Sequence, residues 1–123
     1  MRILLAENRP RVRFALRALL GEQPGLQIVG EATHGQDLLV QIEAACPDLV
    51  LLSWGLPGLA GADLLPALRR VCDDLHVIVL SGRPEARQAV LDAGANAFIS
   101  KVESPEQLLS AIASAEHTNR KGG

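Results

Sequence analysis

The chain has 123 residues, a formal net charge of −2 and two cysteines. That length fits one domain, which would bury roughly two-thirds of the surface that its unfolded chain exposes. The near-balanced charge argues against a chain-wide nucleic-acid-binding surface. The apolar run at residues 3–6 is too short for a signal peptide, and no stretch reaches the ~18 apolar residues of a membrane span. We therefore expect a cytoplasmic protein that does not contact membranes.

The two cysteines, Cys46 and Cys72, are far apart in the sequence and lack CxxC spacing. No cluster of histidines or further cysteines accompanies them, so a metal site is not expected. In a cytoplasmic protein such cysteines are usually reduced thiols, and we predict that state for both.

Apolar runs alternate with helical patterns in the first half of the chain. Residues 3–6 form the first run, and a helical pattern follows from Pro10, which suits a first helical turn, to Gly21. A second run at 26–32 precedes a helical pattern at 36–45. The third run, at 49–52, is entirely apolar, as is typical of a strand buried on both faces.

The same alternation continues in the second half. A loop rich in glycine and proline spans 53–62, and the expected elements are helices at 63–71 and 84–93 and strands at 76–80 and 97–99. Ser104 is suited to cap the last helix, with Pro105 at its first position. Residues 117–123 look frayed. We therefore expect a domain at 1–116 and a flexible tail or cut linker at 117–123.

This alternation predicts an α/β fold in which five helices cover both faces of a parallel sheet. The common five-stranded arrangement is flavodoxin-like and doubly wound, with strand order 2-1-3-4-5 and a ligand crevice at the carboxyl ends of strands 1 and 3. Polar residues follow the strands at that edge, which brings together Glu7, Asn8, Ser53, Ser81 and Lys101. Flavin is not expected there, because residues 7–10 lack a phosphate cradle rich in Ser, Thr and Gly.

At these residues the sequence resembles the receiver domain of two-component response regulators. The resemblance runs from Arg2 to about Ala115, and its details are most similar to receivers that precede a helix-turn-helix output domain. The stretches that carry it are ILLAEN at 3–8, PDLVLLS at 47–53, LPG at 56–58 with Gly61, GANAFISK at 94–101 and SPE at 104–106.

The resemblance implies a fold built for phosphoryl transfer from a histidine kinase to an aspartate that ends strand 3. On the matching positions, Glu7 corresponds to the first of two Mg²⁺-binding acids. Ser81 and Lys101 correspond to the hydroxyl and the lysine that contact the phosphoryl group, and Phe98 corresponds to the aromatic that changes rotamer on activation. Two positions depart from the pattern. Asn8 stands at the second acid, and Ser53 stands at the aspartate itself.

These departures change the chemistry that the pocket is expected to support. Glu7 and Lys101 alone sum to zero charge, whereas Mg²⁺ favours several anionic oxygens. An unaided serine hydroxyl is also a weak nucleophile. We therefore predict no catalytic residue, no metal, no cofactor and no enzymatic activity. Glu7 and Lys101 are expected to form a structural ion pair.

Ser81, Phe98, Trp54 and the arginines of the first helix each have a structural interpretation as well as a functional one. We expect Ser81 to bond nearby backbone and Phe98 to pack statically, although a surviving rotamer switch stays open. Trp54 either covers the vacated pocket or lies on the surface. Arg9, Arg13 and Arg17 share a helix face, which is either solvated or docks an acidic partner, and direct nucleic-acid binding is not expected.

The leading interpretation is a phosphorylation-independent pseudo-receiver that signals by protein contact or homodimerisation, through the fourth helix, fifth strand and fifth helix or through the first helix. A C-terminal DNA-binding output domain would lie beyond this chain. The alternatives are an ordinary receiver engineered at Ser53, regulation by phosphorylation of Ser53, and a small-ligand sensor. Asn8 argues against the engineered receiver, because one introduced change would not explain both departures.

Overall fold

The computed structural model describes residues 1–58, 61–100 and 105–122. Its strands form one parallel sheet in the order β2-β1-β3-β4-β5, which confirms the predicted doubly wound, flavodoxin-like topology. The strands are β1 (Arg2–Ala6), β2 (Gln27–Ala32), β3 (Leu49–Ser53), β4 (His76–Ser81) and β5 (Ala97–Ser100). The helices are α1 (Pro10–Gly21), α2 (Gly35–Ala45), α3 (Gly61–Val71), the 3₁₀ turn η1 (Pro84–Ala86), α4 (Arg87–Asp92) and α5 (Pro105–Gly122).

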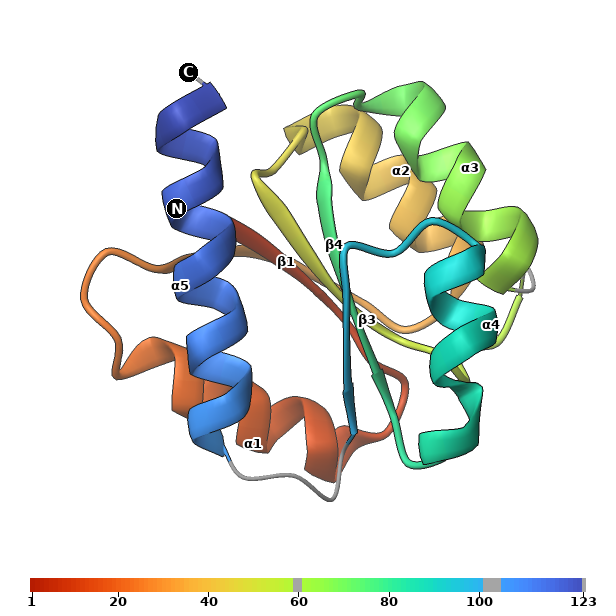
Figure 1. The fold of residues 1–123 in the computed structure, drawn as a ribbon, viewed down its shortest axis with the longest axis horizontal. Coiled ribbons are helices and arrows are strands. Elements are labelled where there is room, and N and C mark those ends of the chain that lie inside the picture. The colour runs from red at the N-terminus through yellow and green to blue at the C-terminus, as the bar shows by residue number, and fades with distance from the viewer. Residues whose placement is uncertain (59–60, 101–104, 123) are drawn as a thin grey trace.

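The helices cover the sheet on both faces. Figure 1 shows α1 and α5 on one side of the strands and α2, α3 and α4 on the other. The connections between parallel strands are right-handed crossovers. Given the strand order, this handedness places α1 and α5 on the face of the sheet opposite α2, α3 and α4. None of the helices in the described part of the chain is long and apolar enough to span a membrane.

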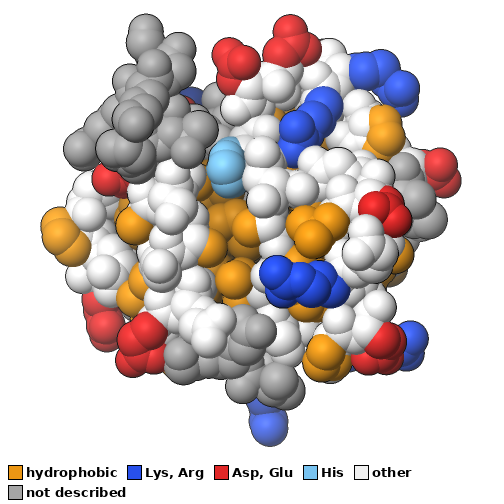
Figure 2. All heavy atoms as spheres, viewed as in Figure 1, with side chains coloured by type: hydrophobic (Ala, Val, Ile, Leu, Met, Phe, Trp, Pro, Cys, Tyr) orange, Lys and Arg blue, Asp and Glu red, His pale blue; other side chains and the backbone are white. Residues whose placement is uncertain are grey.

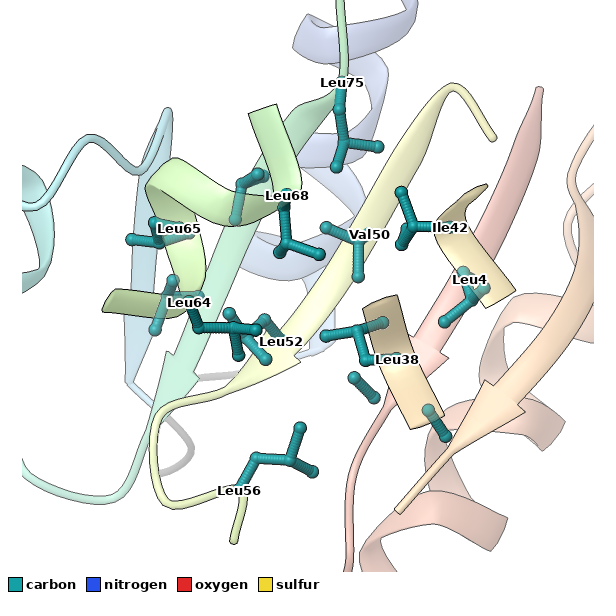
Figure 3. Close-up of a cluster of buried hydrophobic side chains, with 14 of the residues drawn as sticks. Leu4, Leu38, Ile42, Val50, Leu52, Leu56, Leu64, Leu65, Leu68 and Leu75 are labelled. Carbon is teal, nitrogen blue, oxygen red and sulfur yellow. The ribbon is translucent and has the colours of Figure 1, made fainter. Parts of the chain in front are cut away.

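A separate apolar cluster lies on each face. The first combines alternate residues of β1, β3 and β4 with the inner faces of α2 and α3, and it includes Leu4, Leu38, Val50, Leu64 and Leu68 (Figure 3). The second places residues of the opposite strand face against α1 and α5. Because β3 contributes to both clusters and is buried along its whole length, its carboxyl end is held rigidly at the centre of the sheet edge.

Two expected elements differ from the structure at their ends. The helix expected at 84–93 begins as the 3₁₀ turn η1 and becomes α-helical only at Arg87. Helix α5 extends to Gly122, through most of the segment that looked frayed in the sequence. The interpretation of 117–123 as a tail or linker stays a prediction. The expected cap residue Ser104 lies outside the described residues.

The prediction of two reduced thiols is wrong, because Cys46 and Cys72 form a disulfide with their Cα atoms 5.8 Å apart. Cys46 caps the carboxyl end of α2, and Cys72 follows the carboxyl end of α3. These helices pack side by side and lead into the adjacent strands β3 and β4, so their ends meet at the amino edge of the sheet. Spacing along the sequence does not reveal this proximity, which depends on the packing of α2 against α3.

Candidate functional site

The site lies where β1, β3 and β4 end. Glu7 follows the last residue of β1, while Ser53 and Ser81 are the last residues of β3 and β4. The pairing of Ser53 with Leu80, and of Ala6 with Leu52, aligns these ends at one edge of the sheet. All three polar residues are buried, with 0% of Glu7, 4% of Ser53 and 6% of Ser81 exposed.

Glu7 is held by bonds at both its side chain and its backbone. Its Oε2 accepts the backbone N–H of Arg9 at 3.0 Å, and its carbonyl accepts a bond from the Arg13 guanidinium at 3.0 Å. Its own N–H donates to the Ala32 carbonyl at 3.0 Å. Lys101, its expected ion-pair partner, lies outside the described residues, so that pair stays a prediction.

The loops at this edge line a cavity of about 530 Å³ that is partly open to solvent. Three predicted site residues, Asn8, Ser53 and Ser81, line it together, whereas Glu7 is not among the described lining residues. The half-buried Trp54 also lines it and packs against the α2–α3 side core. Trp54 therefore borders the pocket, and the interpretation that its indole covers the pocket stays a prediction. The remaining lining residues are Arg9, Gly55, Gly82 and Arg83.

The donor set of this cavity does not suit Mg²⁺. Among the described residues that line it, the polar side chains are two hydroxyls, an amide and two guanidinium groups, and none is a carboxylate. Mg²⁺ loses its water shell reluctantly and is usually held through one or two carboxylates, while neighbouring guanidinium groups repel it. The lining is suited to anions instead.

Two side chains singled out from the sequence have structural partners. The hydroxyl of Ser81 accepts the backbone N–H of Arg83 at 3.1 Å, as expected for a residue that stabilises its own turn. Phe98 is 6% exposed and belongs to the core cluster on the α2–α3 side. The Arg87 guanidinium lies 5.8 Å from its ring centroid. These contacts agree with static packing, and the rotamer switch stays a prediction.

The arginines at the start of α1 and along it do not form one surface. Arg13 and Arg17 both pair with Glu31 of β2, at 3.3 Å and 3.2 Å. Arg17 also lies 5.6 Å from the ring centroid of Phe14. Arg9, by contrast, lines the cavity. The repeat of arginine every four residues thus divides between an internal ion-pair network and the pocket.

The sequence places Glu7, Asn8 and Arg9 in the loop after strand 1 at the ligand edge, and Arg9 does line the pocket. Arg83 is a pocket residue that the sequence interpretation does not include. The available signal is that Arg83 lies two residues after the strand-end residue Ser81, in a loop at the same edge. Loop residues at that edge surround the crevice in this class of sheet.

Comparison with known proteins identifies the family. The model of the response regulator receiver domain matches residues 3–113. The chain is 37% identical over 115 residues to the transcriptional activator protein ExaE of Pseudomonas putida, covering 91% of this chain and 53% of that protein. It is 32% identical over 114 residues to the response regulator UvrY of Escherichia coli O6:H1, covering 91% and 52%.

A solved structure agrees with these relatives. The signal receiver domain of the response regulator NarL from Mycobacterium tuberculosis superposes with a TM-score of 0.84 at 27% identity, covering 94% of this chain and 95% of that one. The chain spans about half the length of the curated relatives, as the 53% and 52% coverages show. Sequence, fold and site position together show that the chain belongs to the family of response regulator receiver domains.

Proposed function

We propose that this receiver domain signals without aspartyl phosphorylation, through contact with a protein partner or a second copy of itself. The observation that carries the proposal is the chemistry at the end of β3. Ser53 is the final residue of that strand, and the cavity beside it has no carboxylate among its described lining residues. A receiver that accepts a phosphoryl group needs an acidic nucleophile and an acidic metal site at that edge.

The chemistry of serine supports the same interpretation. An aspartyl phosphate is a reactive mixed anhydride, whereas a phosphoserine would be a stable ester. A serine hydroxyl also needs a neighbouring base to become a nucleophile. Glu7, which follows β1 at the same edge of the sheet, is fully buried, and its Oε2 already accepts a hydrogen bond from the Arg9 N–H.

The α4–β5–α5 face is the surface that we assign to the partner. Figure 2 shows hydrophobic side chains gathered in the middle of the view, between the positions that α5 and α4 occupy in Figure 1. Partly exposed apolar residues on these elements include Leu91 of α4, Ile99 of β5 and Leu109 of α5. Because β5 is an edge strand, this face is open to a docking protein.

Helix α1 is the second candidate surface. Its Phe14 is 64% exposed, which is unusual for a large aromatic side chain on a small domain. The flanking arginines Arg13 and Arg17 are already paired with Glu31, so an acidic partner would have to compete with an internal carboxylate. That competition makes α1 the weaker of the two surfaces.

The relatives suggest what the partner contact controls. One is named a transcriptional activator, and this chain covers 53% of its length. We propose that the domain regulates a C-terminal DNA-binding output domain, in the cytoplasm, and does not itself act as an enzyme or bind DNA. Phosphorylation of Ser53 by an unrelated kinase is a less favourable alternative, because Ser53 is only 4% exposed.

The test is a Trp54 fluorescence titration with MgCl₂, followed by beryllofluoride or acetyl phosphate. Trp54 is the only tryptophan and lines the cavity, so it reports directly on the site. We expect no saturable response in the millimolar range and no covalent phosphoryl adduct by mass spectrometry. A saturable Mg²⁺ response from the unaltered chain would contradict the proposal.

A double variant tests whether the missing carboxylates are the reason that the pocket is not expected to bind Mg²⁺. Ser53→Asp combined with Asn8→Asp adds two carboxylates at the pocket, and we expect it to gain Mg²⁺ binding. Ser53→Asn, which is close in size to the aspartate but uncharged, is the matched control and should gain none. If the double variant binds no more Mg²⁺ than the control, loss of acid is not the cause.

A further inference from the structure

Two loops at the cavity share a short motif, an arginine followed by a proline. Arg9-Pro10 follows β1, and Arg83-Pro84 follows β4. The residue before a proline is sterically restricted to extended backbone. Both arginines are extended, with φ −86° and ψ 117° at Arg9 and φ −113° and ψ 102° at Arg83. The same local restriction therefore shapes both loops.

The main chain of each arginine is anchored in the same way. The backbone N–H of Arg9 donates to Glu7 Oε2 at 3.0 Å, and that of Arg83 donates to Ser81 Oγ at 3.1 Å. In both loops the acceptor is a buried side chain two residues earlier. These bonds position the two arginine backbones at the cavity, while both residues remain solvent-exposed.

Arg9 and Arg83 differ from the arginines along α1 in their ion pairs. Arg13 and Arg17 pair with Glu31. Within the described parts of the chain, neither Arg9 nor Arg83 forms an ion pair, although both line the cavity. Their side chains are thus available to a ligand from solvent, on backbones that are already held in place.

We propose that this cavity binds a phosphate oxyanion without a metal ion, clamped between Arg9 and Arg83. Guanidinium groups bind phosphate through paired, charge-assisted hydrogen bonds. The hydroxyls of Ser53 and Ser81 and the amide of Asn8 add polar groups to the same lining. The inference deepens the proposed function and rests on it, because the carboxylates of an acidic pocket would repel the same anion in the absence of a metal ion.

The ligand is either inorganic phosphate or the phosphate of a small metabolite. A cavity of about 530 Å³ exceeds the needs of one phosphate group, and Trp54 borders the remaining space. An aromatic group attached to the phosphate could stack on that indole. Inorganic phosphate and adenosine monophosphate therefore serve as the two probes, and a tighter response to the nucleotide would identify a phosphorylated metabolite as the source.

The experiment is a Trp54 fluorescence titration of the 123-residue chain with each probe, in EDTA and at constant ionic strength. We expect saturable binding to the unaltered chain. Replacing one charged donor should weaken binding at least about tenfold in Arg9→Gln and in Arg83→Gln. Arg11→Gln is the matched control, because Arg11 is exposed on α1 outside the cavity lining, and its affinity should be unchanged.

The outcomes separate this inference from the proposed function. Binding that appears only when MgCl₂ replaces EDTA would overturn both. No saturable binding under either condition, checked by calorimetry, would overturn the anion clamp and leave the phosphorylation-independent receiver standing. Equal affinities in the Arg9, Arg83 and Arg11 variants, each with an unchanged melting temperature, would also overturn the clamp. A loss confined to the two cavity variants supports it.

Discussion

Removal of the Cys46–Cys72 disulfide is expected to destabilise the domain measurably. The bridge joins residues 26 positions apart, and closing a loop of that length removes about 3.5 kcal/mol of chain entropy from the unfolded state in the loop-closure model. Unfolding of a 123-residue domain carries an entropy of about 0.26 kcal/mol per kelvin, so this corresponds to a melting temperature lower by about 14 °C. Strain in the native bridge would reduce both figures.

The assay is thermal unfolding followed by circular dichroism, with and without a phosphine reductant. Cys46 is exposed, so the reductant can reach the bridge. The Cys46→Ser variant lacks the bridge, and its melting temperature should be low and insensitive to reductant. Mass spectrometry under denaturing conditions establishes whether the bridge is intact at the start. If an intact bridge is reduced and the melting temperature does not fall, the entropic argument is refuted.

The redox state of the Cys46–Cys72 pair also bears on the cellular location. Disulfides are rare in the cytosol, where thiol systems keep cysteines reduced. The bridge in the structure and the proposed cytoplasmic location therefore predict different states of these cysteines in cells, and only the cytoplasmic location predicts free thiols. Thiol trapping in intact cells before lysis would reveal free Cys46 and Cys72, and a fully protected pair would contradict the proposed cytoplasmic location.

Two further predictions concern stability. Gly58 has φ +104°, and an added Cβ would lie 3.0 Å from the Gly35 nitrogen, so Gly58→Ala should lower the free energy of unfolding in urea by about 1–3 kcal/mol. Gly55→Ala is the control and should cost far less, because nothing lies within 4 Å of its added Cβ. Equal losses in the two variants would contradict the steric argument. Burial, helped by the Arg69 guanidinium, lowers the pKa of His76 below its ordinary value of 6.5. The unfolded chain then binds more protons, so stability should decline as the pH falls below about 6.5, and this decline should be smaller in His76→Gln; identical pH profiles would refute the assignment.

The sequence by itself determined the elements and their order. The strands and helices can be predicted from apolar runs bounded by Gly and Pro, because these patterns involve only residues that are close in the chain. Right-handed crossovers then leave few arrangements of five parallel strands. The same rule placed Asn8, Ser53 and Ser81 at one edge, because parallel strands end on the same side, and all three line the cavity. These features follow from local pattern and chirality.

The tertiary structure alone decided which side chains meet across elements. The Cys46–Cys72 bridge exists because α2 packs against α3, and Glu31 attracts Arg13 and Arg17 because β2 lies beside α1. Such contacts depend on the distance between elements that are remote in sequence, which no local periodicity encodes. For the same reason Arg83, unremarkable in its own loop, became a pocket residue only when β4 was placed next to β3.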